Sequence, residues 1–118
     1  MEATKEHVLQ NDVRVALAQA GCIVFRANVG KVKMDNGRWF DTQLPPGFPD
    51  LFGMTFHDNR MFFIEMKTET GRPREDQIKF HRMLTARGAI HGIARNREDA
   101  LRIVNERLVG YGFEKYDK

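Results

Sequence analysis

Two acidic residues and one lysine are spaced in a way that suits the hydrolysis of phosphodiester bonds. Asp50 opens an apolar segment directly after Pro49, and Glu65 and Lys67 close the next apolar segment along the chain. Carboxylates bind hard divalent cations such as Mg²⁺, which polarise a phosphoryl oxygen and lower the pKa of a bound water molecule. A lysine beside them can orient or deprotonate that water and offset negative charge in the transition state. The three residues therefore predict metal-assisted phosphodiester hydrolysis.

The two segments that carry these residues have the composition of β-strands. Residues 50–56 and 61–67 are rich in apolar and aromatic side chains and are joined by a short polar turn, which predicts a β-hairpin. In a strand Glu65 and Lys67 point to the same face, and the hairpin brings Asp50 back beside them. Both segments are apolar at nearly every position, which indicates a sheet covered on both faces.

Hydrophobic periodicity and turn residues predict the remaining elements. In chain order we expect a helix over 4–19, a strand over 22–28, a turn-centred excursion over 31–46, the two strands of the hairpin, a helix over 74–87, a strand over 89–94 and a helix over 95–108, with the tail 109–118 unassigned. This order predicts an α/β fold with a mixed central sheet flanked by helices.

Composition restricts both the fold and the chemistry. The chain has 118 residues, a net charge of +3 and 42% hydrophobic residues, which fits one globular domain. No apolar run approaches the ~20 residues of a membrane span and the first residues are charged, so we expect a soluble cytoplasmic protein without a membrane partner. The sequence contains no serine, which excludes a serine nucleophile, and Tyr111 and Tyr116 lie in a tail that is expected to fray. No glycine-rich phosphate loop is present, so we expect no nucleotide cofactor.

The dipeptide Pro49-Asp50 followed by Glu65-Met66-Lys67 is typical of the PD-(D/E)xK nuclease superfamily. The motif is short, and an alternative stays open in which Asp50 opens a turn while Glu65 and Lys67 face solvent at a strand end. Context favours the functional interpretation, because the motif residues begin and end two consecutive apolar strands and an amphipathic helix follows directly. The four histidines have no metal-type spacing, and we interpret them as structural.

Further blocks of sequence extend the similarity beyond this motif. They are Glu6 in the first helix, 21–31, 37–40, 47–53, 62–67 and 76–77. In this order and at these distances they resemble the virus-type replication and repair nuclease (VRR-NUC) family, in particular its small stand-alone phage members. The resemblance runs from about residue 5 to residue 105 and implies a single VRR-NUC-like domain over residues 1–118, with a restriction-endonuclease-like PD-(D/E)xK core.

The resemblance also implies roles for individual residues. The metal ligands would be Glu6, Asp50, Glu65 and the backbone carbonyl of Met66. Lys67 would be the catalytic base or water-orienting group, and Gln77 would reach into the site from the start of a helix. The implied cofactor is Mg²⁺ or Mn²⁺, and the implied activity is cleavage of branched DNA such as four-way junctions or flaps in replication, recombination or repair. From the residues alone, Glu6 lies on the polar side of its helix, where a solvated carboxylate is the ordinary case, and Gln77 has no stronger signal.

Basic residues flank the motif in the sequence, beside one aromatic pair. They are Lys31, Lys33 and Arg38 in the excursion, next to Trp39 and Phe40, and Arg72 and Arg74 in the turn after the second strand. We predict that these cations contact DNA phosphates and that Trp39 stacks on a base or acts as a wedge. The alternatives stay open: loop cations of a basic protein can simply be solvated, and Trp39 can cap the edge of a core.

The size of the chain predicts its assembly. A domain this small can hardly engage two strands of a junction with one site, so we expect a homodimer with two active sites. Its contact would use the apolar surface of a helix or of the tail, such as Leu108, Tyr111 and Phe113. Two other functions stay open at this point: a nucleic-acid-binding or assembly module without turnover, and a metal-dependent enzyme acting on small phosphate esters.

Overall fold

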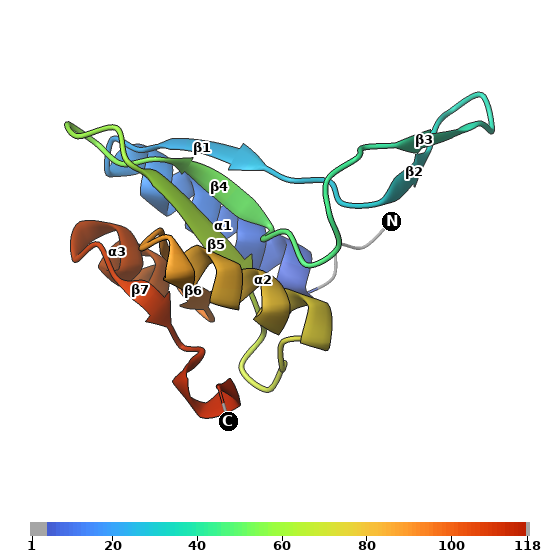
Figure 1. Cartoon of the computed structure of the whole chain (residues 1–118). Coiled ribbons are helices and arrows are strands. Elements are labelled where there is room, and N and C mark those ends of the chain that lie inside the picture. Colours follow the sequence, from blue (N-terminus) through green and yellow to red (C-terminus); the bar gives the residue numbers. More distant parts are fainter. Residues whose placement is uncertain (1–4, 118) are drawn as a thin grey trace.

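A five-stranded mixed sheet forms the centre of the molecule (Figure 1). The computed structural model describes residues 5–117. The strands lie in the order β1 (Ile23–Arg26), β4 (Leu51–Met54), β5 (Met61–Met66), β6 (Ile90–Ala94) and β7 (Val109–Tyr111). The pairs β1 with β4 and β4 with β5 are antiparallel, whereas β5 with β6 and β6 with β7 are parallel. The predicted mixed sheet and the predicted hairpin are both confirmed.

Helices cover both faces of this sheet (Figure 1). They are α1 (Lys5–Gln19), α2 (Glu75–Ala86) and α3 (Arg97–Asn105). The alternation of side chains along β5 assigns the faces. Phe62, Ile64 and Met66 are fully buried in one hydrophobic core with residues of α1 and α3. Phe63 and Glu65 point the other way, toward α2, so the Glu65–Lys67 motif belongs to the α2 face. None of the helices in the described part of the chain is long and apolar enough to cross a membrane.

An aromatic cluster fixes the proline-rich segment that leads into β4. The ring of Phe48 packs against Phe52, Phe63 and Phe80, with ring centroids 5.3–6.0 Å apart and edge-on geometry. Next to it, Gly47 has a φ of +87°, and a Cβ there would lie 2.2 Å from a backbone carbonyl oxygen at the start of α2. The close approach requires glycine, and it holds this segment against α2 directly before Asp50.

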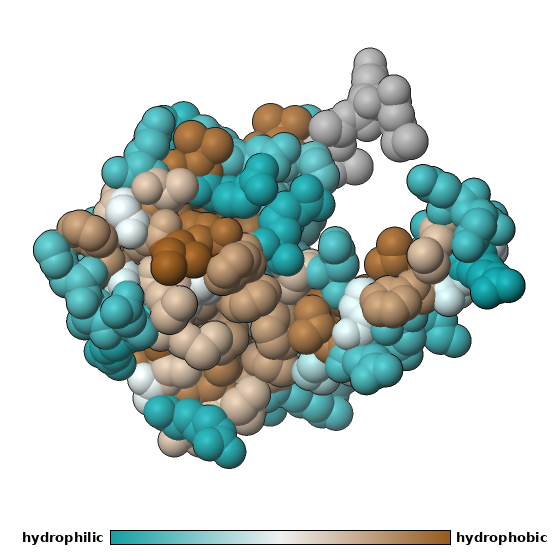
Figure 2. Space-filling model, turned by 90° about the horizontal axis from the view of Figure 1, so that it is seen from above, coloured by the Kyte–Doolittle hydropathy of each residue, from teal (hydrophilic) through white to brown (hydrophobic). Residues whose placement is uncertain are grey.

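The predicted excursion is a separate two-stranded hairpin. Its strands β2 (Lys31–Lys33) and β3 (Trp39–Asp41) pair only with each other, and the hairpin projects away from the central sheet (Figure 1). Figure 2 shows it as an arm that stands off the body, with apolar side chains along its length and hydrophilic ones at its end. The turn signal Asp35-Asn36-Gly37 was therefore interpreted correctly.

The C-terminal tail is ordered, which differs from the expectation of fraying. Strand β7 pairs with β6, and a 3₁₀ turn, η1 (Glu114–Tyr116), follows it. Phe113 is only 3% exposed and stacks on the ring of His81 at 4.0 Å. This side chain therefore packs within its own chain, and it is not available for the dimer contact that the sequence suggested. The homodimer itself stays a prediction.

Candidate active site

The register of the β4–β5 hairpin sets two carboxylates opposite each other. Leu51 pairs with Ile64, so the register continued by one residue places Asp50 opposite Glu65. Residues directly opposite in an antiparallel pair share a face, with their Cβ atoms about 5 Å apart. This geometry confirms the prediction that the β4–β5 hairpin places Asp50 beside Glu65.

The backbone of Met66 ties Asp50 to the end of β5. The Met66 N–H donates to the Oδ2 atom of Asp50 at 2.8 Å. In an extended strand the N–H and C=O groups of one residue point to the same side, so the Met66 carbonyl also faces Asp50. On the other side of β5, the Lys67 N–H donates to the carbonyl of Ala94 on β6 at 3.1 Å. The end of β5 is thus held from both neighbouring strands.

Burial of Glu65 beside the half-buried Asp50 favours a proton on Glu65. Glu65 is 3% exposed, and its pKa is raised to about 10 by burial and by the charge and hydrogen bond of Asp50. The charges of Lys67 and Arg74 lower this pKa but do not offset burial. In the metal-free protein Glu65 is therefore protonated at neutral pH, and a divalent cation beside the two groups would replace that proton.

Lys67 completes the group on the α2 face. Its Nζ atom lies 4.0 Å from Oε1 of Glu65, and the residue is 8% exposed. The position two residues after Glu65 on an extended segment accounts for this shared face, as the sequence predicted. A buried ammonium beside two carboxyl groups is suited to orient water or a phosphate oxygen.

Gln77 connects the start of α2 to the carboxylates. Its Nε2 atom donates to Oε1 of Glu65 at 3.0 Å, and its Oε1 atom accepts the backbone N–H of Arg74 at 2.8 Å. The amide therefore caps the first turn of α2 and at the same time orients Glu65. Both polar atoms of this buried side chain are satisfied, and Gln77 is fixed beside Glu65 as predicted.

Comparison with known proteins identifies the family and the fold. The family model of the VRR-NUC domain matches residues 4–98. The chain belongs to the VRR-NUC family. A solved structure described as a VRR_NUC domain superposes with a TM-score of 0.65 at 21% sequence identity, covering 90% of this chain and 100% of that one. No curated protein shows significant similarity to the chain. The family assigns a nuclease-type domain acting on nucleic acid, and the solved structure confirms the fold.

Glu6 does not form a three-residue metal-ligand group with Asp50 and Glu65 in this VRR-NUC domain. It lies in the first turn of α1, which packs on the face of the sheet opposite to Glu65, although α1 begins at the end of the sheet where β5 ends (Figure 1). Within residues 5–117, no three acidic, histidine or cysteine side chains are close enough together to hold a metal ion. A metal ion bound here would be held by Asp50 and Glu65, and Glu6 as a ligand stays a prediction.

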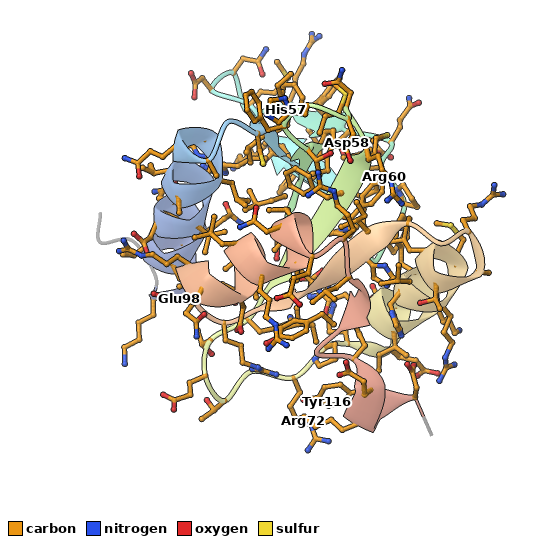
Figure 3. The ribbon with its side chains drawn as sticks, turned by 90° about the vertical axis from the view of Figure 1, so that its left-hand side faces the viewer. His57, Asp58, Arg60, Arg72, Glu98 and Tyr116 are labelled. Atoms are coloured by element: carbon orange, nitrogen blue, oxygen red, sulfur yellow. The ribbon has the colours of Figure 1, made fainter. Side chains whose placement is uncertain are left out.

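The predicted DNA-contacting cations occupy three places. Lys31, Lys33 and Arg38 are exposed on the projecting hairpin. Arg74 is exposed at the start of α2, near enough for its charge to act on Glu65. Arg72 follows β5, and its guanidinium lies 5.7 Å from the ring centre of Tyr116; Figure 3 shows the two side by side.

One residue that holds the site together has no assignment in the sequence patterns. Arg95, directly after β6, donates through Nη1 to the carbonyls of Thr68, Glu69 and Gly71 at 2.6, 3.3 and 2.7 Å. Its Nη2 atom donates to the hydroxyl of Tyr116 at 3.4 Å. The guanidinium therefore fixes the turn that follows Lys67. Its only signal in the sequence is a cation placed directly after a buried strand.

The buried histidines are structural, in agreement with the sequence interpretation. His81 and His91 contact each other through Nδ1 and Nε2 at 2.7 Å, and His91 Nδ1 lies 2.7 Å from the carbonyl of Ala89. His81 Nε2 contacts the carboxylate of Asp117 at 2.8 Å. Burial lowers the pKa of His91, which keeps its ring neutral. The network ties the C-terminal tail to α2.

Proposed function

We propose that this VRR-NUC domain is a metal-dependent endonuclease that hydrolyses phosphodiester bonds in DNA. The observation that carries the proposal is that Asp50 lies opposite the buried Glu65, with the buried Lys67 4.0 Å from Glu65, at one end of the sheet. Two carboxylates and an ammonium at one point of a nuclease-type domain are the groups that this chemistry needs.

The donor atoms fit Mg²⁺ or Mn²⁺. Asp50 and Glu65 offer carboxylate oxygens and Met66 a carbonyl oxygen, all hard ligands. Mg²⁺ typically uses one or two carboxylates and fills its other positions with water and substrate phosphate, so two carboxylates suffice. A cation bound there would supply Lewis acidity toward the scissile phosphate and would acidify the attacking water.

The residues of the chain divide the remaining tasks. Asp50 is held in place by the N–H of Met66, and Glu65 is oriented by Gln77, so neither carboxylate needs to move. Lys67 orients the attacking water and offsets negative charge on the phosphate oxygens as the bond to the leaving oxygen breaks. Gln77 is a positioning residue, because it contacts Glu65 rather than the reacting atoms.

The proposed substrate is branched DNA, such as a four-way junction or a flap, in replication, recombination or repair. Support comes from the resemblance to the stand-alone members of the family and from the distribution of cations. The chain has a net charge of +3, and exposed basic residues lie on the hairpin, on the turn after β5 and at the start of α2. A homodimer would bring two sites to two strands, and its mass by light scattering tests that part: a strict monomer at assay concentration would contradict it.

The decisive experiment compares cleavage of labelled single-stranded, duplex, flap and four-way-junction DNA in Mg²⁺, in Mn²⁺ and in EDTA. We expect cuts in the presence of either cation and none in EDTA. The variant Lys67→Ala should lose cleavage and keep DNA binding, whereas Lys79→Ala, an exposed lysine on α2, should cut like the wild type. Binding without cleavage under every metal condition would reject the nuclease and favour a non-catalytic binding module.

A further inference from the structure

The β2–β3 hairpin carries exposed aromatic rings that do not pack in the hydrophobic core. Every residue from Lys31 to Asp41 is exposed, with Trp39 at 64% and Phe40 at 58%. A two-stranded hairpin of this kind is at best marginally stable without a surface to pack on. Exposed large aromatic side chains on such an arm indicate a partner that covers them.

The register of the hairpin sorts its side chains into two different faces. Lys33 pairs with Trp39, and Lys31 pairs with Asp41, so these four residues share one face. The Asp41 carboxylate on that face accepts the backbone N–H of Gln43 at 2.8 Å. The two lysines and one acid leave a net positive charge beside the indole ring.

The opposite face is apolar with one cation. Val32 pairs with Phe40 there, and the hydrogen bond from the Met34 N–H to the Arg38 carbonyl, at 2.7 Å, continues the ladder by one pair. By the same alternation, Arg38 lies on the face of Phe40. The sequence grouped Arg38 with the two lysines, but the structure separates them.

The base of the β2–β3 hairpin lies beside Asp50 of the proposed active site. The hairpin is inserted between β1 and β4, and at its base the N–H of Ala27 donates to the carbonyl of Asp50 at 2.8 Å. From Ala27 to Lys33, the pairing partner of Trp39, an extended chain reaches at most about 20 Å. That length corresponds to about six nucleotide steps of a stacked strand.

We propose that the face made by Lys31, Lys33 and Trp39 binds unpaired bases of the DNA strand that leads into the active site. The inference rests on the proposed function and specifies its substrate. An indole ring stacks on any base but needs the base to be unpaired or at an open end, and the lysines contact the adjacent phosphates. Trp39 thereby selects substrates with single-stranded character near the cut, as at a branch point or flap.

The chain contains a single tryptophan, so its fluorescence reports on this face alone. The wild-type protein in EDTA is titrated with a single-stranded oligonucleotide and with a blunt duplex of the same sequence. Stacking predicts strong quenching by the single strand and a much smaller change with the duplex. Unchanged emission at saturating single strand would overturn the proposal.

Variants on the two faces provide the matched comparison. Trp39→Ala should weaken single-strand binding by at least about fivefold and leave duplex binding nearly unchanged. Trp39→Phe should restore most of the affinity, and Phe40→Ala, which removes an exposed aromatic ring from the other face, should have little effect. Replacing Lys31 and Lys33 by alanine should reduce the slope of log affinity against log salt by about 1.4. Equal losses in Trp39→Ala and Phe40→Ala would indicate a damaged hairpin and would also overturn the proposal.

The outcomes separate this inference from the proposed function. Quenching by single-stranded DNA without cleavage under any metal would keep the binding face and reject the nuclease. Metal-dependent cleavage of flaps at the wild-type rate by Trp39→Ala, without quenching in the wild type, would keep the nuclease and reject the binding face.

Discussion

The metal-free protein should become less stable as pH rises, because the folded state keeps a proton on Glu65 that the unfolded chain releases. The folded protein raises the pKa of this carboxyl group from 4.5 to about 10, so it retains a proton that the unfolded chain releases. The raised pKa of Glu65 therefore contributes to the free energy of unfolding. This contribution is complete below about pH 4.5 and is lost as the pH increases toward 10. This direction is opposite to that of a carboxylate in an ordinary ion pair.

The size of the effect follows from one proton. Between pH 6 and pH 8 the unfolded chain has an ionised Glu65 and the folded protein a protonated one, so the free energy of unfolding should fall by about 3 kcal/mol over the interval. A chain of 118 residues has an unfolding entropy near 0.25 kcal/mol/K, so the melting temperature should fall by about 10 °C.

The assay is thermal unfolding in EDTA at pH 6, 7 and 8, with Glu65→Gln as the matched variant. Glutamine imitates the protonated acid: its oxygen can accept the hydrogen bond from Gln77 and its amide can donate to Asp50. The histidines contribute equally to both proteins, so the difference between the two curves isolates residue 65. Parallel curves would refute the reasoning. Added Mg²⁺ should raise the melting temperature of the wild type most at pH 8 and should hardly affect the variant.

Three further substitutions test the parts of the site. Lys67→Met keeps the volume of the buried stem and should reduce the cleavage rate by at least about 100-fold in a single-turnover assay, while the melting temperature stays nearly constant. Gln77→Ala removes two buried hydrogen bonds and should lower the free energy of unfolding by about 1–3 kcal/mol in a urea titration; intact stability would mean that the amide is not a cap. Arg95→Ala frees the turn after β5, so limited proteolysis should cut within residues 68–72 of the variant, and equal resistance to the wild type would contradict the role of Arg95.

Much of the site could be predicted because it depends on short-range geometry. A hairpin between two apolar strands and the alternation of side chains suffice to bring Asp50, Glu65 and Lys67 together. The same reasoning predicted the projecting hairpin from the turn at Asp35-Asn36-Gly37. The family resemblance added Gln77, because a glutamine near the start of a helix gives no local signal of its own.

The residues that were missed act over long sequence distances. The contacts of Arg95 with the turn after β5, and of Asp117 with His81, depend on how β6 and the tail dock, which no local pattern encodes. The tail was expected to fray because it lies at the end of the chain, where order is usually lowest. It is ordered because Phe113 fills a site beside His81, a contact that only the assembled fold creates.

The unfavourable pairing of Asp50 with Glu65 in the central sheet points to a functional site as strongly as the sequence motif does. Two like charges opposite each other on a sheet are destabilising, and here Glu65 is buried and Asp50 is half-buried as well. A fold selected for stability alone would place apolar residues opposite each other at the ends of β4 and β5. Instead, Met66 and Gln77 hold Asp50 and Glu65 in this unfavourable position, and a proton compensates for it in the metal-free protein. Positions where a fold supports local instability with dedicated hydrogen bonds are expected at functional sites, and a divalent cation is the ligand that would remove this one.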